Sequence, residues 1–169
     1  MNDFAFIALR KLAALVVLLC LAVGASAETE KGRAIAELAA AGLSWDEGTR
    51  TVAVTDEDRA TFKDLATILP ALRVLQPRSL NLSSCSLLQK VDGLSDLPTL
   101  ESINLSACPA LENVDGIAAS AQIKKIYVFE SMKVSTKSLD ALVKRFPKSY
   151  LVLPDGTGLN PPRDKDADR

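Results

Sequence analysis

Hydrophobic residues recur along the middle of the chain with a period of 23 residues. The 23 residues that begin at Leu80 and those that begin at Ile103 are identical at eight positions, and a third copy of the apolar pattern begins at Ile126. Self-similarity at a period of roughly 20 to 50 residues indicates stacked structural units that bury their apolar sides against one another. The middle of the chain is therefore predicted to be an array of small units.

Within each unit, apolar residues first alternate with polar ones and then recur at every third position. Ile103 and Leu105 are separated by one polar residue, so we expect a short strand with both side chains facing the core. The spacing of three at Leu111, Val114 and Ile117 is typical of a tight, 3₁₀-like segment on the opposite side. Equivalent strands are expected to pair in parallel and to join their apolar rows into one core.

The motif Leu100-x-x-Ile103-x-Leu105-x-x-Cys108 has the L-x-x-L-x-L-x-x-C/N spacing of leucine-rich repeats. Residues 30 to 153 resemble the small exported bacterial leucine-rich repeat proteins, and the segment 138–147 is similar to the closing helix of such repeats. The resemblance implies an α/β solenoid with parallel strands on the concave face, short helical or 3₁₀ segments on the convex side, and helical end caps. It also implies binding by the concave face and no shared catalytic residues.

The chain divides into four segments by composition and pattern. Residues 28–57 are expected to form an N-terminal cap helix and a first strand, residues 58–153 the leucine-rich repeat domain, and residues 154–169 a charged tail without fixed structure. In the cap helix, over 30–42, the expected inner residues are Ile35, Leu38 and Ala39.

Two further helices are predicted inside the repeat domain. One follows the capping residues 55–58 and ends before Pro70, with an apolar stripe that comprises Phe62, Leu65, Ile68 and Leu69. The other is capped by Ser135, has Leu139, Leu142, Val143 and Phe146 on its inner side, and leads to a final strand over 150–153.

The first 27 residues have the three parts of a secretory signal peptide. Arg10 and Lys11 precede an uncharged apolar run over 12–23, and Ala25-Ser26-Ala27 provides a cleavage site. We therefore expect cleavage after Ala27 and a secreted or periplasmic protein. The alternative is an uncleaved leader that anchors the chain, although 12 apolar residues are fewer than the roughly 20 that span a bilayer.

The strand positions between the core residues face outward and form three rows across the units. Small polar residues occupy these rows in the first two units, whereas Lys125, Tyr127 and Phe129 occupy them in the third. Exposed aromatic residues beside a cation are typical of protein-binding hot spots, so we expect a protein partner here. The alternative is that the terminal helix covers these rings, or that they are isolated apolar residues on the surface. The candidate residues are Ser79, Asn81, Ser83, Ser102, Asn104, Ser106, Lys125, Tyr127 and Phe129.

Cys85 and Cys108 are one repeat apart and are expected at equivalent corners of neighbouring units. Neighbouring strands lie about 4.8 Å apart, which brings a disulfide within reach. Thiols at this position of the repeat usually hold the turn from inside, so we favour two reduced cysteines and leave the disulfide as the alternative.

Composition and charge exclude several kinds of catalytic site, metal site and partner. The chain contains no histidine, which excludes Ser-His-Asp triads, Cys-His dyads and histidine-ligated zinc. We therefore expect a monomeric binding protein with no enzymatic activity, cofactor or metal. The net charge of −1 gives no reason to expect a nucleic-acid partner. This small net charge is the sum of an acidic stretch over 28–70 and a basic stretch over 123–149. The basic stretch could steer an acidic partner to the protein.

Two alternatives remain open from the sequence. The first is a structural, envelope-associated protein held by its uncleaved leader, in which case the leader is the expected contact with a membrane. The second is a small parallel β-helix enzyme that acts on polysaccharide, because the coils of that fold have a similar length. The L-x-x-L-x-L spacing and the absence of clustered acidic or basic catalytic residues on the strands disfavour the enzyme.

Overall fold

The computed structural model describes residues 28–118 and 122–160. The predicted leader, with its cleavage site after Ala27, and residues 161–169 of the predicted tail lie outside the described residues. In the described part, no helix is long and apolar enough to cross a membrane.

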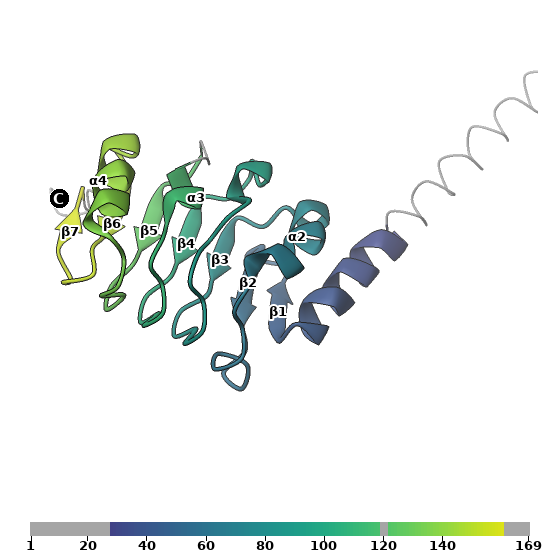
Figure 1. Ribbon diagram of the computed structural model, residues 1–169. Coiled ribbons are helices and arrows are strands. Elements are labelled where there is room, and N and C mark those ends of the chain that lie inside the picture. The colour runs from purple at the N-terminus through teal and green to yellow at the C-terminus, as the bar shows by residue number, and fades with distance from the viewer. Residues whose placement is uncertain (1–27, 119–121, 161–169) are drawn as a thin grey trace, which may run out of the picture.

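Seven strands form one open sheet in which each strand lies beside its neighbour in the chain (Figure 1). The strands β2 to β6 are parallel, while β1 and β7 pair antiparallel at the two ends. The prediction of an α/β protein with a mainly parallel sheet is confirmed. The strands are β1 (Leu43–Asp46), β2 (Thr51–Val54), β3 (Ser79–Asn81), β4 (Ser102–Asn104), β5 (Lys125–Tyr127), β6 (Tyr150–Val152) and β7 (Gly158–Leu159).

Helical segments return the chain from one parallel strand to the next and lie along one side of the sheet (Figure 1). A first helix covers residues 28–40 and precedes β1. The later segments are the 3₁₀ turn η1 (Leu65–Thr67), α2 (Leu69–Leu75), the 3₁₀ turn η2 (Leu94–Asp96), α3 (Asp115–Ala118) and α4 (Thr136–Arg145). The hydroxyl of Ser135 accepts a hydrogen bond from the Ser138 N–H at 3.2 Å, so the predicted cap of α4 is confirmed.

The register of the sheet reproduces the 23-residue period of the sequence. Ser79 pairs with Ser102 and Ser102 with Lys125, so equivalent residues of β3, β4 and β5 stand side by side. One buried row crosses all five parallel strands and consists of Val52, Leu80, Ile103, Ile126 and Leu151. The residues predicted for the core of the middle units are buried, because alternate side chains of each strand point to the helical side.

The helix predicted between residue 58 and Pro70 is wrong. The chain instead forms turns over 56–61, the short η1, and then α2, which has Pro70 in its first turn. Proline has no N–H to donate, and the first turn of a helix is the one place where this donor has no partner within the helix. Phe62, Leu65 and Ile68 are buried as expected, although they do not share one helix.

Two smaller expectations at the ends are also corrected. In the first helix Ala39 is exposed, and Ala34 is buried beside Leu38 instead. The predicted tail is ordered up to residue 160, because β7 pairs with β6 and Leu159 packs against the core. The sequence over 154–160 is poor in apolar residues, so this strand is held by backbone pairing and one leucine.

Candidate functional site: the open face of the sheet

The face of the sheet opposite the helices carries all nine candidate residues. Six of them, Ser79, Asn81, Ser83, Ser102, Asn104 and Ser106, are half-buried. Lys125 is exposed, Tyr127 is half-buried and Phe129 is 41% exposed. The structure therefore brings the nine residues onto one surface, with the serines and asparagines on β3 and β4 and the lysine and the rings at β5.

The rows continue past the ends of the strands. The Leu82 N–H donates to the Asn104 carbonyl at 2.8 Å, and the Leu105 N–H donates to the Tyr127 carbonyl at 2.7 Å. This pairing holds the backbone of Ser83, Ser106 and Phe129 in the same array, although these residues lie beyond β3, β4 and β5. The open face is consequently built on a continuously hydrogen-bonded backbone, which sets the spacing between its rows of side chains.

The two asparagines also have a structural role that the sequence did not suggest. The side-chain oxygen of Asn81 accepts a hydrogen bond from the Ser83 N–H at 3.2 Å, and that of Asn104 accepts one from the Ser106 N–H at 3.0 Å. Each asparagine thereby stabilises the turn that follows its strand. The Asn-x-Ser spacing in both units is the feature of the sequence from which these two hydrogen bonds could have been predicted.

Lys125, Tyr127, Phe129 and Tyr150 form the aromatic cluster of the open face. The rings of Tyr127 and Tyr150 meet edge to face, with 5.8 Å between their centroids and 87° between their planes. Tyr150 was missed in the sequence because β5 and β6 are 25 residues apart in register, not 23. The ring of Phe129 lies against Gly156, where a β-carbon on the glycine would stand 3.3 Å from the ring.

These contacts bear on the alternative that the terminal helix covers the rings. The neighbours of Tyr127 and Phe129 belong to β6 and to the turn before β7. This packing orients the rings and leaves Phe129 accessible to solvent.

The chain matches no protein-family model, no curated protein and no solved structure. What the protein does must follow from the chemistry of its own side chains. Within residues 28–118 and 122–160, no three histidine, cysteine, aspartate or glutamate side chains are grouped as a metal site.

Cys85 and Cys108 are free thiols with no exposed surface. The thiol of Cys108 donates to the Leu82 carbonyl at 3.2 Å, and the hydroxyl of Ser131 donates to the Leu105 carbonyl at 2.7 Å, one unit further on. Burial raises the pKa of the Cys85 thiol from 9.0 to about 12, with a smaller contribution from Cys108, and burial also raises the pKa of Cys108. Both thiols are thus protonated at neutral pH and act as parts of the core.

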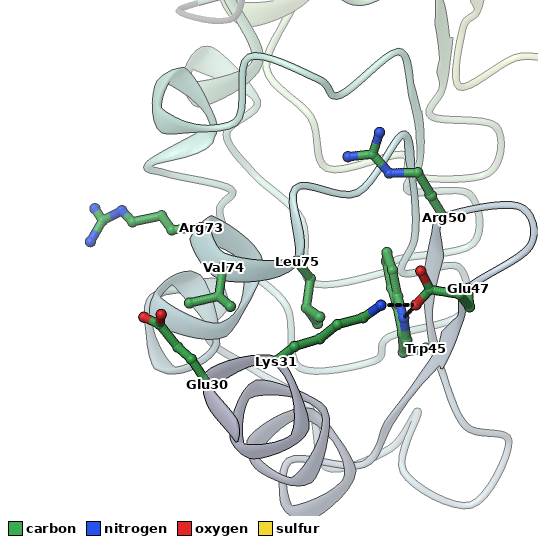
Figure 2. Close-up of a pocket in the computed structure, with 8 residues that line it drawn as sticks. All are labelled: Glu30, Lys31, Trp45, Glu47, Arg50, Arg73, Val74 and Leu75. Atoms are coloured by element: carbon green, nitrogen blue, oxygen red, sulfur yellow. Dashed lines mark hydrogen bonds and ion pairs between the residues drawn. The ribbon is translucent and has the colours of Figure 1, made fainter. Parts of the chain in front are cut away.

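A pocket of about 690 Å³ lies at the other end of the molecule, between the first helix, β1 and α2 (Figure 2). Most of its polar side chains have partners. Lys31 forms an ion pair with Glu47 at 2.7 Å, the Trp45 indole N–H donates to Glu47 at 2.8 Å, and Arg50 donates to the Gln76 carbonyl. The ion pair between Lys31 of the first helix and Glu47 after β1 therefore helps to hold this helix against the sheet.

Proposed function

We propose that this protein is an exported leucine-rich repeat module that has no enzymatic activity and binds another protein through the concave, open face of its sheet. The observation that carries the proposal is the aromatic cluster of Lys125, Tyr127, Phe129 and Tyr150 on an uncovered face. Aromatic residues give large contact areas at a small cost in side-chain entropy, which is why they dominate binding hot spots.

Three features support the assignment to leucine-rich repeats. The strands β3, β4 and β5 pair in register at intervals of 23 residues, and a continuous apolar row lies behind them. The position of the motif that holds cysteine or asparagine is filled by Cys85, Cys108 and Ser131, which are all buried. The hydroxyl of Ser131 makes the bond that the Cys108 thiol makes one unit earlier, so serine at this position still fits the pattern.

The two alternatives, an enzyme and a structural protein held by its leader, each require a feature that can be checked. An enzyme that hydrolyses polysaccharide usually uses a pair of carboxylates on its binding face, and the candidate rows hold only serine, asparagine, lysine and aromatic residues. A structural protein retained by its leader would keep residues 1–27. Mass spectrometry of the protein recovered from its own cell would separate these cases, because an N-terminus at Glu28 is incompatible with the anchor.

The proposal is tested by crosslinking from defined positions in the native cell. A photoreactive amino acid at position 129 should trap a partner protein that can be identified by mass spectrometry. The same group at position 87 is the control, because Leu87 is also exposed, at 49%, but is not part of the open face.

Mutation of the cluster gives the second arm of the test. The triple variant Lys125→Ala, Tyr127→Ala, Phe129→Ala should lose capture of the identified partner at least tenfold while its circular dichroism is unchanged. The matched control is Ser79→Ala with Ser102→Ala on the same face, which should retain capture. Equal capture by the triple variant would show that the aromatic cluster is not the binding surface.

A further inference from the structure

The C-terminal third of the chain carries lysines that are not paired with carboxylates. Residues 123–149 contain seven cations and two acids. Lys124 is paired with Glu101 at 3.0 Å. In contrast, Lys133, Lys137, Lys144 and Lys148 are exposed and have no ion pair or hydrogen bond within the described part of the chain. These four residues are called the basic stripe below.

In residues 28–118 most of the cations form an ion pair, although Lys63 and Arg78 are exposed and form none. The ion pairs there join Lys31 to Glu47, Arg33 to Glu37, Arg59 to Asp56, Arg73 to Asp96 and Lys90 to Asp92. Unpaired like charges repel one another and destabilise the folded state. The basic stripe is therefore an excess of positive charge that the surrounding described side chains do not neutralise.

The stripe lies on and around α4, on the helical side of the sheet, away from the open face. Ser138 and Leu142 of α4 are buried, whereas Lys137 and Lys144, two helical turns apart, are both exposed. Lys133 precedes the helix, and Lys148 follows it. Asp140 is the only acid in the helix.

An exposed apolar side chain stands next to the stripe. Met132, directly before Lys133, is 72% exposed, which is the largest value among the exposed large hydrophobic residues of the described chain. Methionine is flexible and unbranched, so it can enter an irregular apolar environment at low steric cost. Peripheral proteins contact anionic bilayers through clustered basic side chains together with shallow insertion of apolar ones, and Met132 offers an apolar side chain beside Lys133.

We propose that the basic stripe and Met132 bind the surface of a membrane that contains anionic phospholipids. Lysine acts as a point charge that needs no fixed partner geometry, which suits lipid head groups that diffuse in a plane. Lys137 and Lys144 are two turns apart and therefore lie on one side of α4, with Lys133 shortly before the helix and Lys148 shortly after it. The contact would hold the helical side against the membrane and leave the aromatic cluster free for a partner.

Sedimentation with lipid vesicles tests this inference. The protein used has the N-terminus that is found in the cell. We expect binding to phosphatidylcholine vesicles that contain phosphatidylglycerol, much weaker binding to phosphatidylcholine alone, and loss of the difference at high salt. Each lysine near an anionic surface contributes roughly fivefold to partitioning, so Lys137→Gln with Lys144→Gln should weaken it roughly 25-fold. Met132→Ser should weaken it several-fold.

Two control variants separate this site from other sources of binding. Lys63→Gln with Arg78→Gln removes the same charge from exposed positions in the other half of the chain and should leave sedimentation unchanged. The triple alanine variant of the aromatic cluster should also sediment normally, so failure of this inference is distinguishable from failure of the proposed function.

Two outcomes would overturn the inference. Equal binding to neutral and anionic vesicles would show that the contact is not electrostatic. Failure to sediment with anionic vesicles, together with lysine-dependent retention on immobilised polyglutamate, would assign the stripe to an acidic protein instead.

Discussion

At the scale of single residues, the turns after the strands depend on a left-handed backbone at three equivalent positions. Ser84, Ala107 and Glu130 have φ values of 64°, 56° and 58°. Their N–H groups donate to carbonyls of the following unit, at 2.8 Å for Ser84, 2.7 Å for Ala107 and 2.9 Å for Glu130. The left-handed region costs a residue with a β-carbon about 1 to 2 kcal/mol, so these hydrogen bonds and the packing around them must offset that cost.

This conformation predicts an unusual order of stability at position 107. Ala107→Gly removes the steric cost but adds entropy to the unfolded chain, so the melting temperature should stay the same or rise slightly. Ala107→Val should lower stability by more than about 1 kcal/mol, because a β-branched side chain is a poor fit to positive φ. Thermal melts of the three proteins check the order, and a valine variant as stable as the parent would contradict the assigned turn.

The buried thiol of Cys85 predicts a dependence of stability on alkaline pH. Its pKa is raised by burial from 9.0 to about 12 in the folded chain. Between these values the unfolded chain releases the proton and the folded chain retains it, so the free energy of unfolding falls as pH rises. The loss is up to about 1.4 kcal/mol per pH unit within that window, and none is expected below it.

Denaturant unfolding of the parent and of Cys85→Ala from pH 7 to pH 11 measures this contribution. Lysines and tyrosines titrate in both proteins, so the informative quantity is the difference between the two curves. We expect the parent to lose stability faster than the variant above pH 9. Parallel curves would show that the thiol is not buried or that it is not free.

At the scale of elements, the buried side chains behind the sheet tolerate no charge, both in the row through the strands and at Leu105, which directly follows β4. Leu105 is fully buried, and Leu105→Asp would place a carboxylate without a partner between two neighbouring units. The penalty is of the order of several kcal/mol, comparable with the total stability of a small domain, so the chain should be unfolded at 25 °C. Leu87→Asp, at a position that is 49% exposed, is the matched control and should melt like the parent.

The parallel strands could be predicted because their side-chain pattern repeats. Alternation at Ile103 and Leu105 sets the inner face, and the 23-residue period fixes which strands become neighbours. The segment before β3 could not be predicted in the same way. Its apolar spacing at Phe62, Leu65 and Ile68 fits a helix, but Pro70 starts a helix there and does not end one.

The residues of the open face could be predicted only on the strands that follow the 23-residue period. Lys125, Tyr127 and Phe129 follow from the repeat, whereas Tyr150 comes from a unit of different length and joins the cluster through the register of β5 and β6. The hydrogen bonds of Asn81 and Asn104 are local, two residues along the chain, and the repeated Asn-x-Ser spacing could have indicated them. The pocket beside Trp45 joins segments that are far apart in the sequence, so no local pattern specifies it.

At the scale of the whole molecule, both ends of the sheet are protected. At the N-terminal end, β1 pairs antiparallel with β2, and Ala34 and Leu38 of the first helix are buried in the same core. At the C-terminal end, β7 pairs with β6, and Leu159 packs against the core. The outer edges of the sheet are therefore short strands, β1 with four residues and β7 with two, which offer few free N–H and carbonyl groups to other chains and favour a monomer.

Truncation tests the role of the C-terminal end. A chain that ends at Leu153 lacks β7, exposes the edge of β6 and loses the contact of Leu159, so its melting temperature should fall by several degrees. Light scattering should also show association that increases with concentration, because the edge of β6 can now pair with another copy. A chain that ends at Asn160 keeps β7 and is the control, which should melt and scatter like the parent. If both truncated chains behave like the parent, the parallel units are stable without the terminal strand and the expected monomer must have another physical basis.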